Sequence, residues 1–118
     1  MILEEDAILN LSMREVIESF GHKVVSFYSA IAAMEAISEG DYIDGLVTDI
    51  DLGAGPDGFH VASFARRLHP SLAVVYASGT AVAQHAAYGV RGSVFVSKPY
   101  HPHQILDAFS RLIHLEAA

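Results

Sequence analysis

Four short polar groups in this 118-residue chain combine side chains that could act together on one substrate. Short apolar runs are followed directly by Glu4-Glu5-Asp6, by Asp49-Ile50-Asp51, by Ser78-Gly79-Thr80 and by Lys98-Pro99. Clustered carboxylates repel one another, so acids gathered from separate runs call for a divalent cation, and Mg²⁺ prefers carboxylates, water and phosphate oxygens. A serine and a lysine beside them could hold the oxygens of a phosphoryl group, and an aspartate could be the nucleophile.

The elements that would position these groups begin with five apolar runs. They cover residues 2–3, 24–28, 45–48, 72–77 and 94–96. The last four runs are rich in β-branched or aromatic residues, and several do not alternate between apolar and polar positions. This pattern predicts parallel strands that are covered on both faces.

Helical spacing of apolar residues separates the runs. It predicts helices over residues 9–20, 30–39, 61–68, 81–88 and 102–113. Ser29 can cap the second helix, while Gly21 and Gly40 can end the first and the second. The resulting order β-α-β-α-β-α-β-α-β-α predicts an α/β fold with a doubly wound, five-stranded parallel sheet and helices on both faces. In such folds the chemistry lies beyond the carboxyl ends of the strands, which is where the four polar groups fall.

Composition excludes several classes of function. Seven Lys and Arg against 14 Asp and Glu give a net charge of −7, which argues against nucleic acid and against an anionic membrane surface as direct partners. The absence of cysteine excludes a disulfide scaffold and a thiolate zinc site. The chain is 52% hydrophobic, too apolar for disorder, and it contains no apolar run of bilayer length. We therefore expect one acidic, soluble, intracellular domain.

Each polar group also has a purely structural interpretation. An aspartate after a strand often caps a helix, acids favour a helix N-terminus, and Ser78-Gly79-Thr80 could form only a turn. Four such groups at strand ends in one α/β order favour a functional site instead. His101-Pro102-His103 and His114 are interpreted as surface histidines, because Pro102 should prevent helical pairing of its neighbours.

Over its whole length the chain resembles the receiver domain of two-component response regulators. The matching residues are Glu4-Glu5, Asp49, Pro56-Asp57-Gly58, Ser78-Gly79 and Lys98-Pro99, in that order along the chain. The resemblance implies a flavodoxin-like fold with strand order 2-1-3-4-5. It further implies a cytoplasmic receiver domain over residues 1–118 with no output domain.

The resemblance also implies the chemistry of the acids. Asp49 would accept a phosphoryl group from the phosphohistidine of a histidine kinase or a phosphotransfer protein. Glu5, Asp49 and the backbone carbonyl of Asp51 would bind Mg²⁺, with Glu4 nearby through water. The Glu-Glu pair departs from the acidic pairs usual in the family, so Asp6 could compete as a ligand. The Asp51 carboxylate could repel the phosphoryl group or steer an attacking water.

The remaining matched residues imply a switch. Ser78 and Lys98 would hold the phosphoryl oxygens, the Lys98-Pro99 peptide bond would be cis, and Ser78 and Phe95 would change position on phosphorylation. The domain would then signal through contact with a downstream protein. It would not be an enzyme, beyond slow dephosphorylation of itself at most.

Two alternatives stay open at this stage. One is a degenerate receiver that acts only as a protein-binding module. The other is a phosphohydrolase of the haloacid dehalogenase type, in which Asp49-Ile50-Asp51 would supply the nucleophile and a general acid. That family places its Asp-x-Asp motif after the first strand, whereas here the motif follows the third.

Overall fold

A computed structural model describes residues 1–79 and 82–117, so Thr80 and Ala81 lie outside the described residues. Within this part of the chain there are five strands: β1 (Ile2–Leu3), β2 (Ser26–Phe27), β3 (Gly45–Thr48), β4 (Ala73–Ser78) and β5 (Val94–Ser97). They form one parallel sheet in the order β2-β1-β3-β4-β5. The predicted doubly wound fold and its strand order are confirmed.

The helices of the described chain alternate with the strands. They are α1 (Ala7–Ser19), α2 (Ala30–Ser38), α3 (Gly58–Leu68), α4 (Val82–Tyr88) and α5 (Pro102–Ala117). Ser29 caps α2 as predicted, since its hydroxyl accepts a hydrogen bond from the amide of Ala32. Gly21 and Gly40 follow the ends of α1 and α2 with φ values of 89° and 97°, a conformation that favours glycine.

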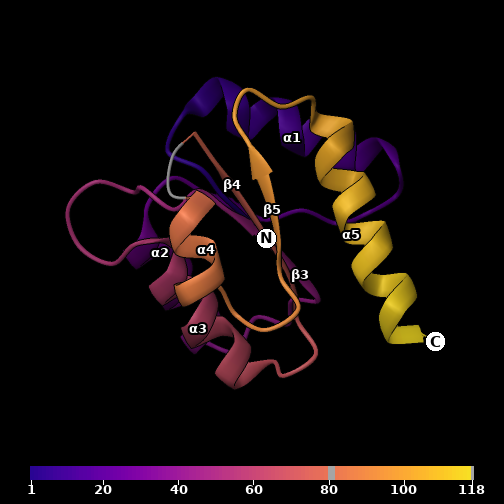
Figure 1. Ribbon diagram of the computed structural model, residues 1–118. Coiled ribbons are helices and arrows are strands. Elements are labelled where there is room, and N and C mark those ends of the chain that lie inside the picture. Colours follow the sequence, from indigo (N-terminus) through magenta and orange to yellow (C-terminus); the bar gives the residue numbers. More distant parts are fainter. Residues whose placement is uncertain (80–81, 118) are drawn as a thin grey trace.

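The helices cover both faces of the sheet (Figure 1). Residues of α1 and α5 share one core cluster with Val47 and Val75, while α2 and α3 share the other with Leu46 and Val74. Successive strand residues therefore point into opposite cores, as a parallel sheet requires. All six residues of β4 are buried, so this strand runs through the centre of the molecule.

The elements differ from the predicted ones mainly at the margins of the fold. The strand predicted over residues 24–28 is only Ser26–Phe27, because β2 is an edge strand and its neighbour β1 offers only two residues to pair with. On α2, Ile31 is 61% exposed whereas Ala30 and Ala33 are buried. The buried face of α2 therefore consists partly of alanines, which its hydrophobic pattern did not reveal.

Candidate functional site

The carboxyl ends of β1, β3 and β5 bring two acids and one base together. The ammonium of Lys98 lies 2.7 Å from Oε1 of Glu4 and donates a hydrogen bond of 2.9 Å to Oδ2 of Asp49. Glu4 is 1% exposed and Asp49 is 7% exposed. The contact with Glu4 is a close ion pair rather than an aligned hydrogen bond. Three of the predicted site residues thus form one cluster, in which both acids are buried and the lysine is partly buried, and which we call the Glu4–Lys98–Asp49 cluster.

Burial and charge act against each other in this cluster. Burial raises the pKa of Glu4 above its ordinary value, although the Lys98 ammonium opposes that shift. Burial alone would lower the pKa of Lys98, but its contacts with Glu4 and Asp49 outweigh burial and raise that pKa. Lys98 is therefore a permanent cation at neutral pH, shared between two carboxyl groups.

Glu4 is held in place by the first helix. The side-chain amide of Asn10, buried on α1, donates hydrogen bonds of 3.0 Å to the backbone carbonyls of Glu4 and Phe27. Oε2 of Glu4 accepts a hydrogen bond from the amide of Asp6, whose own carboxylate caps α1. The sequence analysis did not identify Asn10 as a site residue. Its position three residues before Met13, on the buried face of α1, is the signal that could have indicated this role.

Asp49 is held by its neighbours in sequence and by the start of α3. The hydroxyl of Thr48, fully buried, donates a 2.7 Å hydrogen bond to the carbonyl of Asp49. The amide of Gly58 donates to the carbonyl of Ile50, and a Cβ atom on Gly58 would overlap the carbonyl oxygen of Asp49. Only glycine can bring the first turn of α3 this close to the acid.

Two other acids predicted at the site, Asp51 and Glu5, lie at the β3–α3 loop, which projects from the body of the molecule (Figure 1). The amide of Asp51 donates a 3.3 Å hydrogen bond to Oδ1 of Asp49. Glu5 is exposed, and its Oε2 comes within 4.0 Å of where a Cβ atom on Gly53 of this loop would lie. Asp6 caps α1 through the amides of Ile8 and Leu9, so its carboxylate has a structural role.

The carboxylate oxygens of the site are ligands of the kind that Mg²⁺ prefers, but they do not form a complete coordination shell. Within residues 1–79 and 82–117 there is no group of three or more His, Cys, Asp or Glu side chains arranged to hold a metal ion. Mg²⁺ needs only one or two carboxylates, because water supplies most of its ligands. The site offers hard oxygen donors, and its two acids face only one lysine, so their negative charge is not fully compensated. This is a suitable environment for Mg²⁺.

Ser78 lies at the end of the neighbouring strand. It is the last residue of β4 rather than the residue after it, and it is buried. Its carbonyl accepts a hydrogen bond from the amide of Lys98, which ties the ends of β4 and β5 together beside the cluster. The Lys98-Pro99 peptide bond is cis, as predicted.

Phe95 lies on β5, away from the acids. Its ring is partly buried and packs at 5.7 Å from the ring of His85 on α4. His85 in turn contacts the ring of the buried Tyr76 and hydrogen-bonds to the hydroxyl of Ser93. Phe95 is thus in contact with the fourth helix through His85.

His101 and His103 are exposed, as predicted for surface histidines, although their rings contact each other across Pro102. Their rings stack with centroids 4.8 Å apart, and their Nδ1 atoms are 3.0 Å apart. Pro102 begins α5, so His101 precedes the helix and can accept a hydrogen bond from the amide of His103. Both rings are exposed, and they lie outside the acid cluster; the side chain of His114 lies outside the described residues.

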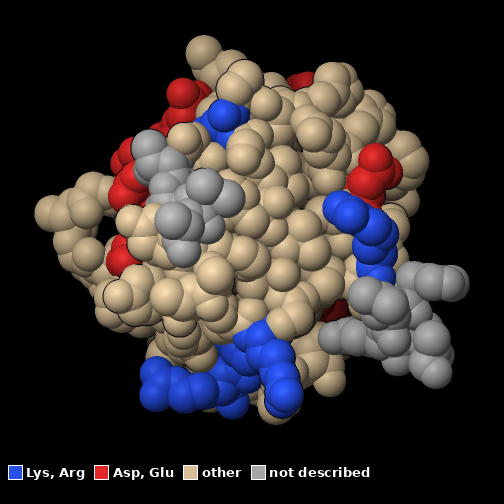
Figure 2. All heavy atoms as spheres, viewed as in Figure 1, with Lys and Arg blue, Asp and Glu red and all other residues tan. Residues whose placement is uncertain are grey.

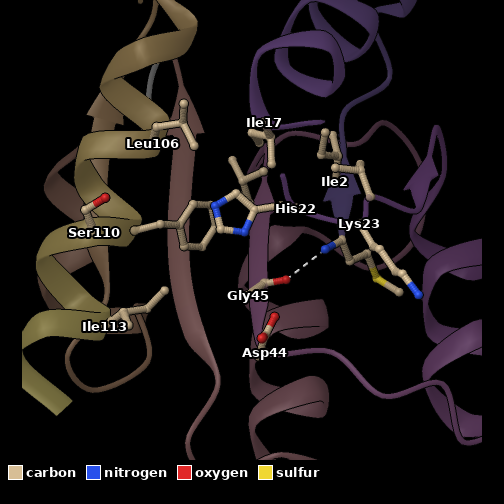
Figure 3. A pocket seen from close by; sticks show the side chains of 13 residues that line it. Ile2, Ile17, His22, Lys23, Asp44, Gly45, Leu106, Ser110 and Ile113 are labelled. Atoms are coloured by element: carbon tan, nitrogen blue, oxygen red, sulfur yellow. Dashed lines mark hydrogen bonds between the residues drawn. The ribbon is translucent and has the colours of Figure 1, made fainter. Parts of the chain in front are cut away.

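A hollow of about 120 Å³ lies at the other ends of the strands, between α1, α5 and the sheet (Figure 3). Ile2, Ile17 and Leu106 line it, and the amine of Met1 donates a 2.8 Å hydrogen bond to the carbonyl of Gly45 at its margin. The Glu4–Lys98–Asp49 cluster does not line this hollow. Its location and mainly apolar lining therefore set it apart from the candidate site.

Comparison with known proteins agrees with the geometry. Residues 1–110 match the family model of the response regulator receiver domain. The structure is similar to that of a response regulator receiver protein from Sinorhizobium medicae, with a TM-score of 0.91, 35% identity and coverage of 96% of this chain and 91% of that chain. A CheY-like receiver domain protein from Methanospirillum hungatei matches with a TM-score of 0.86, 21% identity and coverage of 98% and 94%. None of the described helices is both long and apolar enough to cross a bilayer.

Proposed function

Because this chain belongs to the receiver-domain family of two-component response regulators, we propose that Asp49 is its phosphoacceptor and that the domain signals by contact with other proteins. Receiver domains of this family accept phosphoryl groups, generally with Mg²⁺, and interact with histidine kinases and downstream effectors. The observation that carries the proposal is the Glu4–Lys98–Asp49 cluster at the carboxyl ends of the strands.

The proposed reaction transfers a phosphoryl group from a phosphohistidine to Asp49. A carboxylate oxygen of Asp49 forms a bond to phosphorus as the P–N bond breaks, and the imidazole of the donor keeps that electron pair. Lys98, 23% exposed, already contacts Asp49 and would pair with the phosphoryl oxygens. The hydroxyl of Ser78 would donate a hydrogen bond to the same group.

Mg²⁺ would be held by Glu5, Asp49 and the backbone carbonyl of Asp51, with Glu4 taking part through water. When bound, the cation neutralises negative charge on the phosphoryl oxygens. Glu4 has a further role that its contacts support: it positions the Lys98 ammonium beside Asp49. Asn10 and Gly58 are positioning residues, because they fix the backbone of Glu4 and of Asp49.

The test is to incubate the protein with Mg²⁺ and a small phosphoryl donor and to measure intact mass. We expect one added phosphoryl group in the wild type and none in Asp49→Asn, because an amide is a very poor nucleophile. Labelling of Asp49→Asn would show that Asp49 is not the phosphoacceptor. Absence of labelling in both the wild type and Asp49→Asn would favour a degenerate receiver. Turnover of a small phosphomonoester would instead favour the dehalogenase-type alternative.

A further inference from the structure

A groove of about 490 Å³ lies between α3 and α4, next to the β3–α3 loop. Its apolar lining consists of the buried Ile50 and Phe59 and of Tyr88, which is 64% exposed. Its polar lining consists of Asp51, Asp57, His60, Ser63 and Gln84. Apolar surface with a few converging polar groups, in a volume of this size, is typical of a binding site.

We propose that this α3–α4 groove docks an arginine-bearing segment of a partner protein, and that phosphorylation of Asp49 strengthens the docking. The second part rests on the proposed function, whereas the first does not. Asp51 and Asp57 supply two carboxylates, and Tyr88 supplies an exposed aromatic face next to Phe59, whose ring centroid is 5.9 Å away. A guanidinium group can pair with carboxylates in a planar fork and stack on such a ring, which an ammonium does less well.

The distribution of charge supports a cationic ligand at this groove. Acidic side chains lie along the margin of the molecule that carries the β3–α3 loop, whereas cations gather near the far end of α3 (Figure 2). At that far end, Arg66 and Arg67 occupy the last turn of α3, and Arg66 bonds to the carbonyl of Arg91. The start of α3 is therefore the end that attracts cations and the far end repels them.

Asp57 keeps capacity for a ligand while it caps α3. Its Oδ1 atom accepts hydrogen bonds from the amide of His60 and contacts Nδ1 of the same residue at 2.9 Å. Its Oδ2 atom takes no part in either contact.

Asp51 connects the groove to the phosphorylation site. Its amide donates to Oδ1 of Asp49, and its side chain lines the groove. Phosphorylation replaces one carboxylate charge with a group that carries roughly two negative charges at neutral pH. At constant Mg²⁺ this adds negative charge within two residues of the groove, so affinity for a cationic segment should rise.

The binding test is an NMR titration with the capped tripeptide Arg-Leu-Arg, compared with Lys-Leu-Lys and Glu-Leu-Glu. We expect saturable shift changes at His60, Ser63, Gln84 and Tyr88, with the arginine peptide binding most tightly. Asp57→Ser should weaken binding at least about threefold while a serine still caps α3. Tyr88→Leu should also weaken it, as a second variant that leaves the cap intact.

Asp107→Asn is the matched control, since Asp107 is an exposed acid on α5, away from the groove. An equal loss of affinity in Asp107→Asn, or shifts spread over α1 and α5, would show mere attraction to an acidic protein and overturn the proposal. Absence of saturable binding would overturn it as well.

The coupling test repeats the titration on protein that intact mass has shown to be phosphorylated. We expect affinity for Arg-Leu-Arg to rise by about fivefold, at the lower end of typical coupling between sites. Equal affinity of labelled and unlabelled protein would overturn the coupling. If labelling itself fails, the proposed function is what fails, and the titration of the unmodified protein still decides whether the groove binds.

Discussion

A side chain on Gly58 would overlap the carbonyl oxygen of Asp49, so the third helix begins in direct contact with the backbone of the proposed phosphoacceptor. Such a Cβ atom would also come within 2.9 Å of the carbonyl carbon of Asp49 and of Cα of Ile50. All of these neighbours are backbone atoms, which cannot move aside as a flexible side chain could. The position of Asp49 therefore depends on the absence of a side chain nine residues later.

The first prediction is that Gly58→Ala lowers stability and slows phosphoryl uptake. Glycine to alanine in a helix usually stabilises, but here overpacking should cost about 1–3 kcal/mol. Displacement of Asp49 by a fraction of an ångström should slow uptake by roughly tenfold or more. Urea unfolding and intact-mass kinetics measure the two effects. Gly79→Ala is the control for stability, because a Cβ atom there would meet Lys98 Cβ at an ordinary 3.8 Å; equal losses in both variants would contradict the argument.

The second prediction concerns Lys98→Met, which leaves Glu4 and Asp49 without their shared cation. The unfolding free energy at pH 7 should fall by about 2 kcal/mol, somewhat less than for breaking a fully buried pair. Lys23→Met, the same change at the other lysine of the chain, should have little effect because Lys23 is exposed.

The pH dependence of that loss has a definite sign. The folded pKa of Lys98 is raised above its ordinary 10.5, so its contribution is fully present below pH 10.5 and is lost as pH rises through the folded value. The difference in unfolding free energy between wild type and Lys98→Met should thus be constant from pH 8 to 10 and shrink above pH 10.5. A difference that already shrinks below pH 9 would show that Lys98 is not held as described.

The third prediction concerns the metal. Millimolar Mg²⁺ should raise the melting temperature of the wild type by mass action, because it binds the folded acids. Glu5→Gln should weaken this response strongly and Glu4→Gln less, since Glu4 is buried against Lys98. Asp6→Asn is the control, because asparagine also caps α1. A normal response in Glu5→Gln together with a lost response in Asp6→Asn would show that Asp6, and not Glu5, binds the metal.

The fourth prediction concerns the switch. A phosphoryl mimic at Asp49 should change the NMR shifts of Phe95 and of His85, whose rings are in contact. Phe95 has no hydroxyl to select one orientation, so both ring positions should be populated before the mimic is added. The same spectra of Asp49→Asn should not change. Shifts confined to the acids around Asp49 would mean that the domain signals through another face.

The order of elements and the strand ends could be predicted because local signals mark them. Gly21, Ser29 and Gly40 mark helix ends whatever the rest of the chain does. Pro102 shows the limit of such signals. It begins α5, as predicted, but it does not indicate that the ring of His101, just before the helix, stacks on the ring of His103.

The internal arrangement of the site could not be predicted, because it depends on contacts between distant parts of the chain. Nothing in Glu4-Glu5 indicates which glutamate turns inward, since the choice is made by Lys98, 94 positions further on. The contact between Gly58 and Asp49 likewise follows from how α3 returns to the sheet. Ser29 illustrates the contrast, because a cap needs only the next three residues.

The contacts of Lys98 with Glu4 and Asp49 affect how the stability of the protein responds to the concentration of free Mg²⁺. Since an internal cation already offsets part of the charge of the two buried acids, the chain can remain folded when magnesium is scarce. The stability of the fold would then depend on the Lys98 ammonium, whereas the reactivity of Asp49 would depend on Mg²⁺. If phosphoryl uptake needs Mg²⁺ as proposed, a drop in free Mg²⁺ should stop phosphorylation reversibly and leave the domain folded.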